Sequence, residues 1–171
     1  MSTPEVWLRG PLPDLPALLQ PVAHSLMQSR EEAAALLPGF GPEQLWQTPG
    51  GAASVGFHAR HATGALDRLF TYARGEQLTS TQRYTLLAET VPYGHKENGE
   101  RLNAAFAATV DRALEQLRTT SDGALLDVRA VGRAQLPSTV LGLLFHAAEH
   151  TQRHLGQMAA IAKVVRARLT P

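Results

Sequence analysis

Residues 99–119 read GERLNAAFAATVDRALEQLRT, and this stretch decides the fold class of the chain. Its large apolar residues recur at steps of three and four, at Leu102, Phe106, Val110, Leu114 and Leu117. Residues at these steps lie on one face of an α-helix. The stretch therefore predicts a long amphipathic helix with one buried face.

A long helix is also predicted near the start of the chain. It runs from Pro16 to about Leu37, with Asp14 as its cap and a kink at Pro21. The run Pro38-Gly39-Phe40-Gly41-Pro42 ends it, because these residues break helices and favour turns.

Two further long helices are predicted from capping residues. Ser54 caps one that runs to about Arg74, and Gly75 ends it. Ser138 caps the last, over residues 139–168.

The segments between these helices are shorter. Residues 79–89 predict a short helix between the second and third long ones, and residues 127–135 predict a loop or a short extended piece. Four long helices without a convincing sheet predict an all-α protein, an antiparallel four-helix bundle. A length of 171 residues predicts one domain over residues 1–171.

The composition excludes several classes of function. There is no cysteine, so disulfides, thiolate metal sites and cysteine nucleophiles are ruled out. A net charge of +1 with mixed signs argues against a nucleic-acid partner. No apolar stretch is long enough to cross a membrane, and the first residues do not resemble a signal peptide, which predicts a cytoplasmic location.

The chain contains seven histidines, and five of them form two clusters. The last helix carries one cluster and the second helix the other, whereas two histidines stand alone. The first cluster is His146, His150 and His154, the second is His58 and His61, and the isolated residues are His24 and His95.

Helix geometry limits what the triplet can bind. Residues four apart lie on the same face with Cβ atoms about 5–6 Å apart, so two imidazoles can share one ion. His146 and His154 are separated by about 12 Å along the helix axis, at about 1.5 Å per residue. The last helix therefore supplies two ligands at most, and the third has to come from another helix.

The pattern leaves the choice of ligands open. Gly156 would allow a close approach beside His150 and His154, but the pair His146 and His150 has the same spacing. Helical period does not choose between His58 and His61. A plain helical bundle with incidental histidines is the alternative to any metal site.

Two segments resemble the DinB-like superfamily of bacterial metal-binding four-helix proteins. The first is Ser54-Val55 with His61 seven residues after the serine, within residues 54–75. The second is His150-Thr151-Gln152-Arg153-His154-Leu155-Gly156-Gln157, within residues 141–161. The intervening helices fit in length and order, so the resemblance covers most of the chain.

The resemblance implies a set of ligands. The upstream ligand of the family falls on His61 and the paired ligands fall on His150 and His154, while His58 and His146 become neighbours of the site. Two positions depart from the family pattern. Ala53 stands where the family usually has tryptophan, and Leu155 stands where it often has arginine.

The resemblance also implies a function. It predicts a metal-dependent enzyme, a thiol-dependent S-transferase or a hydrolase acting on a small molecule, with a low-molecular-weight thiol as partner. Zinc is the expected ion, and nickel or another first-row ion is the alternative. The alternative function is a non-catalytic metal-binding stress-response protein. A homodimer is expected in either case, and no residue has an assigned catalytic role.

Overall fold

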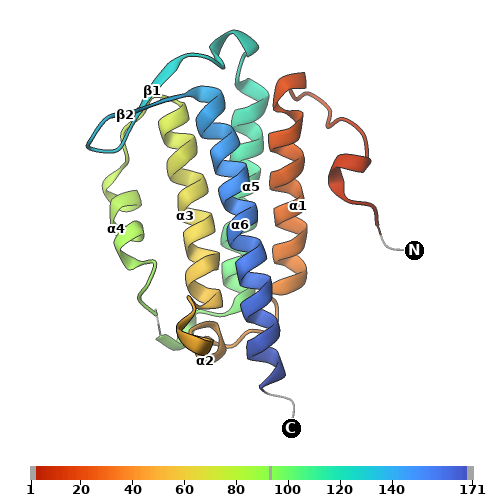
Figure 1. Ribbon diagram of the computed structural model, residues 1–171, viewed down its shortest axis with the longest axis vertical. Helices are drawn as coiled ribbons and strands as arrows, with labels where there is room; N and C mark the ends of the chain where they lie inside the picture. The colour runs from red at the N-terminus through yellow and green to blue at the C-terminus, as the bar shows by residue number, and fades with distance from the viewer. Residues whose placement is uncertain (1–2, 93, 169–171) are drawn as a thin grey trace.

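The structure is a computed structural model that describes residues 3–92 and 94–168, without the side chain of His95. It is mostly helical (Figure 1). The long helices are α1 (Gln20–Leu36), α3 (Val55–Ala73), α5 (Gly99–Thr119) and α6 (Val140–Ala167). The short helices are α2 (Pro42–Leu45) and α4 (Ser80–Ala88), and the strands are β1 (Val128–Val131) and β2 (Leu136–Thr139).

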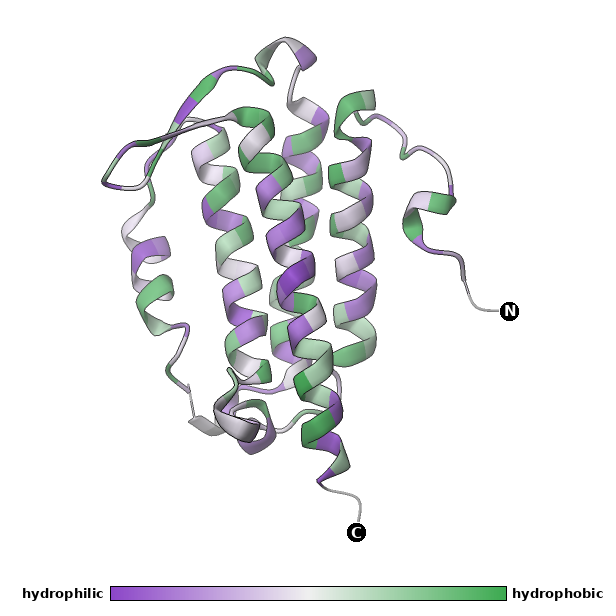
Figure 2. Ribbon diagram, in the orientation of Figure 1, coloured by the Kyte–Doolittle hydropathy of each residue, from purple (hydrophilic) through white to green (hydrophobic). Residues whose placement is uncertain are grey.

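The four long helices lie side by side. Contacts join α3 to α6 and α5, and join α1 to the same two helices; the contact of α3 with α6 is the most extensive. The apolar stripe predicted on α5 is confirmed, since all five residues are buried. Figure 2 shows green apolar and purple polar residues alternating around the long helices, as one buried face on each requires.

The directions of the helices differ from a simple antiparallel arrangement. In Figure 1, α1 and α6 run one way and α3 and α5 run the other. The α3–α6 and α1–α5 contacts are therefore antiparallel, whereas α3 and α5 are parallel neighbours. The reason is the connection over residues 74–98, which includes α4 and is long enough to return along the length of α3.

Of the three predicted cap residues, one is right and two are wrong. Ser54 caps α3, because its Oγ accepts a hydrogen bond from the Phe57 amide at 3.1 Å. Ser138 lies in β2 instead, and the cap of α6 is Thr139, whose Oγ1 accepts from the Gly142 amide at 3.0 Å. Asp14 caps nothing; its φ is +60° and it precedes α1 by several residues.

The predicted kink at Pro21 is absent. A 3-10 helix, Ala17–Leu19, precedes α1, so Pro21 falls in the first turn of the α-helix. There its missing N–H has no intrahelical partner to lose, and its fixed φ suits the helix.

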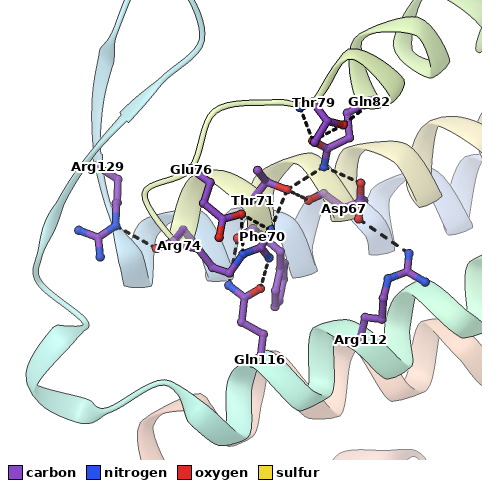
Figure 3. A network of polar contacts seen from close by, with 11 residues as sticks. Asp67, Phe70, Thr71, Arg74, Glu76, Thr79, Gln82, Arg112, Gln116 and Arg129 are labelled. Carbon is purple, nitrogen blue, oxygen red and sulfur yellow. Dashed lines mark hydrogen bonds and ion pairs between the residues drawn. The ribbon is translucent and has the colours of Figure 1, made fainter.

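Residues 128–139 form a β-hairpin; residues 127–135 were predicted as a loop or a short extended piece, and β1 is that extended piece. β1 and β2 are antiparallel, with Val128 opposite Thr139 and Val131 opposite Leu136. Arg129 connects the hairpin to α3, because its Nε donates to the Ala73 carbonyl at 2.9 Å; Figure 3 shows Arg129 there. The pairing depends on β2, which the interpretation of residues 127–135 did not include.

The predicted short helix is present as α4. None of its residues is buried, although it packs on α3. In the part of the chain that the structure describes, no helix combines the length and the apolar character needed to span a bilayer.

Candidate metal centre

Three histidines meet where α3 packs against α6. His61 comes from α3, and His150 and His154 come from successive turns of α6. Each offers one ring nitrogen, and these three nitrogens lie within 4.8 Å of one another. All three side chains are half-buried. The structure thus brings together the three residues that the resemblance selected.

His146 and His24 lie outside this group, and the side chain of His95 is outside the described part of the chain. The His146 side chain is half exposed, and its Nδ1 lies 2.6 Å from Glu149 Oε1. His24 Nε2 lies 3.1 Å from the Gly10 carbonyl oxygen, away from α3. Gly156 does not support the close approach expected of it, because a Cβ there would meet no atom within 4 Å.

Glu89, which follows α4, fixes the orientation of His61. Its Oε2 lies 2.7 Å from His61 Nδ1, while His61 Nε2 lies 2.9 Å from His150 Nε2. A carboxylate accepts only, so Nδ1 of His61 donates to Glu89, and in the neutral ring the lone pair of Nε2 points to His150. This pairing with a carboxylate is the usual outer contact of a metal-binding histidine.

A buried arginine holds Glu89 in turn. Arg68 Nη1 donates to Glu89 Oε1 at 2.7 Å, and both residues are buried. Gly64 makes the arrangement fit, since a Cβ on it would lie 2.6 Å from both of these atoms. A carboxylate with one oxygen on an arginine and the other on an imidazole is fixed at both ends.

Sequence reasoning missed Glu89. The acidic residue nearest to His61 on α3 itself, Asp67, accepts a hydrogen bond from Gln82 of α4. Glu89 is separated from His61 by 28 residues, and no helical spacing connects the two. The sequence showed only that a glutamate ends the predicted short helix. That this glutamate reaches His61 follows from the packing of α4 on α3.

His58 completes the outer contacts of the group. It is buried, and its Nδ1 lies 2.9 Å from Nδ1 of His154. One of these two Nδ1 atoms donates and the other accepts, so only one of them carries a proton and at least one of the two rings is neutral. The Nε2 of His154 stays available to a ligand.

Burial favours the neutral form of three of these rings, those of His58, His150 and His154. It lowers the pKa of His154 to about 4, with further lowering from the neighbouring histidines. Burial, followed by the charge of His61, also lowers the pKa of His58 and of His150. Neutral imidazoles present the lone pairs that a metal ion requires at physiological pH.

The comparisons with known proteins fit this geometry. The family model of the DinB superfamily matches residues 25–158, which include α3, α5 and most of α6. The chain belongs to the DinB superfamily. It also resembles the crystal structure of a DinB-like protein from Bacillus cereus ATCC 10987, with a TM-score of 0.61 and 17% sequence identity, over 83% of this chain and 89% of that one. No curated protein matches the chain.

The three histidines of this DinB superfamily member fit a metal ion. Two nitrogens bound to zinc at about 2.0–2.1 Å lie about 3.3 Å apart at a tetrahedral angle. The His61–His150 separation of 2.9 Å reaches that value with a small ring movement. His150 Nδ1 is buried without a hydrogen-bond partner among the described residues, so hydrogen bonding alone does not account for this ring.

Proposed function

We propose that this DinB superfamily member binds one divalent metal ion through His61, His150 and His154, with zinc as the first candidate. The observation that carries the proposal is the meeting of three half-buried ring nitrogens within 4.8 Å. Glu89 and His58 support it, because each contacts the second ring nitrogen of a proposed ligand. Incidental histidines would not need such matched outer contacts.

The enzymatic form of the proposal is a thiol-dependent S-transferase or a hydrolase that acts on a small molecule. Three imidazole ligands leave coordination positions open, and an ion there lowers the pKa of a bound thiol or water. In this chain, Glu89 holds the proton on Nδ1 of His61 and orients the ring. Phe57 stacks on the same ring, with centroids 5.4 Å apart and planes 15° apart, and limits its rotation.

Metal analysis of protein purified without a histidine tag tests the site. We expect about one ion per chain, as three ligands with an open position imply. His61→Ala and His154→Ala should each abolish tight binding. His146→Ala is the matched control, one turn away on α6, and should retain the ion. A tag-free protein that stays metal-free in metal-replete medium would refute the proposal.

The second candidate is a non-catalytic metal-binding stress-response protein. It is favoured by the origin of the ligands, which come from α3 and α6 alone, so that an ion would join the two helices with the most extensive contact. In this case chelation lowers the melting temperature and no thiol–electrophile pair is turned over. A thiol-dependent turnover that disappears in His61→Ala decides for the enzyme.

We also assign the fold to the four-helix bundles, with two antiparallel and two parallel neighbouring pairs. The contacts of α1, α5, α3 and α6 form a closed ring, as a bundle requires. A cytoplasmic location and a homodimer remain part of the proposal. Sedimentation of the purified protein tests the dimer.

A further inference from the structure

A second site lies on another face of α3. An open cavity of about 490 Å³ lies between α3, α4 and α5, a volume within the range that holds small organic ligands. Its walls include Thr63 and Gly64 of α3, Thr85 of α4, and Leu102 and Ala105 of α5. None of the three clustered histidines lines it, so it is distinct from the metal centre.

The carboxylates in the cavity wall are all paired. Glu97 forms an ion pair with Arg60 at 2.6 Å, in which both side chains are buried. Glu89 is bound to Arg68 at 2.7 Å.

Asp67 is the third of these carboxylates, at the far end of the cavity. It accepts from Gln82 Nε2 at 2.7 Å and lies 3.8 Å from Arg112 (Figure 3). Each acidic group in the wall is thus engaged by a cation or an amide, and no carboxylate is left to neutralise a further cation.

Two cationic side chains in the cavity wall have no ion-pair partner among the described residues. Lys96 and Arg101 line the cavity, and within the described part of the chain neither side chain has an ion pair or a hydrogen bond. Arg101 lies in the first turn of α5, and Lys96 ends the 3-10 helix Gly94–Lys96, three residues before α5 begins. The free amide groups of the first turn of α5 add positive potential there. This end of the cavity therefore attracts an anion.

The rest of the wall suits an apolar body. Leu102 and Ala105 belong to α5, and the methyl groups of Thr63 and Thr85 belong to the opposite helices. The covering helix α4 has no buried residue. Polar contacts hold it to α3 at both ends, through Gln82 and through Glu89, which leaves the space between them to a ligand.

We propose that this cavity binds a small organic anion, with its charged group at Arg101 and Lys96 and its apolar body against Leu102 and Ala105. The anionic group is a carboxylate, phosphate or sulfonate, since these accept hydrogen bonds from a guanidinium. The inference does not rest on the proposed metal function, because no metal ligand contributes to the wall.

Calorimetric titration of the chelator-treated protein tests the site, with anilinonaphthalene sulfonate as the anionic probe and phenylnaphthylamine as its neutral analogue. We expect the anion to bind about tenfold more tightly at low salt, the value of one charge-assisted hydrogen bond. Arg101→Gln should remove this preference without weakening the neutral probe. Arg133→Gln, an exposed arginine outside the cavity, is the matched control.

A second pair of variants locates the probe. Ala105 and Ala104 are both exposed on α5, but only Ala105 lines the cavity. Ala105→Trp should abolish binding of both probes, and Ala104→Trp should leave it unchanged. The proposal is overturned if Ala105→Trp binds like the wild type. It is equally overturned if Arg101→Gln and Lys96→Gln leave the preference for the anion intact.

Discussion

The two sites of this protein lie on neighbouring faces of α3 and differ in how they select a ligand. The histidine cluster between α3 and α6 offers three ring nitrogens, and burial lowers the pKa of His150 and His154, which favours their neutral forms. The cavity between α3, α4 and α5 uses two cations that no carboxylate neutralises. A neutral donor set favours a cation and a surplus of positive charge favours an anion, so the two proposed sites on α3 would bind ligands of opposite charge.

Glu89 belongs to both sites and keeps them apart. It contacts His61 with one oxygen and Arg68 with the other, and it also lines the cavity. Removing it should therefore damage both regions, whereas other variants should damage one.

The largest effect is expected from Glu89→Ala. It leaves Arg68 buried without its carboxylate, and breaking such a pair costs about 3–5 kcal/mol in the free energy of unfolding. It also removes the partner of His61 Nδ1, so metal affinity should fall about 10–100-fold. Urea unfolding of the metal-free protein and metal titration of the folded protein measure the two effects separately.

Glu149→Ala is the control for this experiment. Its carboxylate lies on the surface of α6, next to His150 in sequence, and binds His146 and Arg153. Exposed pairs contribute about 0–1 kcal/mol, so stability should change little and the metal affinity not at all. Equal losses of stability and of metal affinity in the two variants would contradict the role of Glu89 in orienting His61 and pairing with Arg68.

Gly64→Ala should have a smaller effect through the same contact. The new Cβ would lie 2.6 Å from Arg68 Nη1 and from Glu89 Oε1, so the ion pair has to move. Overpacking of this kind costs about 1–3 kcal/mol. Gly156→Ala on α6 meets no atom within 4 Å and should stabilise by up to about 1 kcal/mol. Thermal unfolding of both variants measures this contrast, and equal changes would contradict it.

The sequence predicts those features of the fold and the sites that depend on residues close together in the chain. The stripe on α5 and the cap at Ser54 are local patterns, and both are confirmed. The separation of His146 and His154 along the last helix showed that a third ligand had to come from another helix. The choice of His61 needed the family resemblance, because His58 fits the helical period equally well.

The remaining features depend on tertiary packing. Glu89 reaches His61 only because the connection after α3 folds back along that helix. The spacing of residues in the sequence does not predict that this connection folds back. The same connection makes α3 and α5 parallel, against the prediction. The cap of α6 is Thr139 rather than Ser138, because the hairpin extends as far as Thr139 and the helix starts only at Val140.

The pH dependence of stability distinguishes the histidine cluster from the cavity. The pKa of His154 is about 4 in the folded protein, below its ordinary value near 6.5. Well above pH 6.5, His154 is unprotonated in both the folded and the unfolded chain. As the pH falls below 6.5, the unfolded chain binds a proton at His154 before the folded chain does, so the free energy of unfolding falls. The metal-free protein should thus lose about 1–2 kcal/mol between pH 6.5 and 4, an amount reduced by solvent because the ring is only half-buried.

Urea unfolding from pH 8 to 4 in the presence of a chelator measures this loss. The free energy of unfolding should be flat above pH 7 with respect to this group. His154→Gln should show a shallower fall than the wild type, since it has no proton to bind. His24→Gln, outside the cluster, is the control. Parallel curves for the wild type and His154→Gln would show that the cluster does not cause the pH dependence.

The smallest change in stability is expected at the start of α6. The ligand affinities of the two proposed sites serve as controls there, because neither should change. Thr139→Ala removes the hydroxyl that caps this helix and should cost about 1 kcal/mol. Ser138→Ala, one residue earlier, removes no cap and should cost less than about 0.5 kcal/mol. Because α6 carries His150 and His154 well beyond its first turn, metal and probe affinities should stay at the wild-type values in both variants. A loss of metal affinity in Thr139→Ala would show that the metal centre depends on the first turn of α6 rather than on the local packing of α3, α4 and α6.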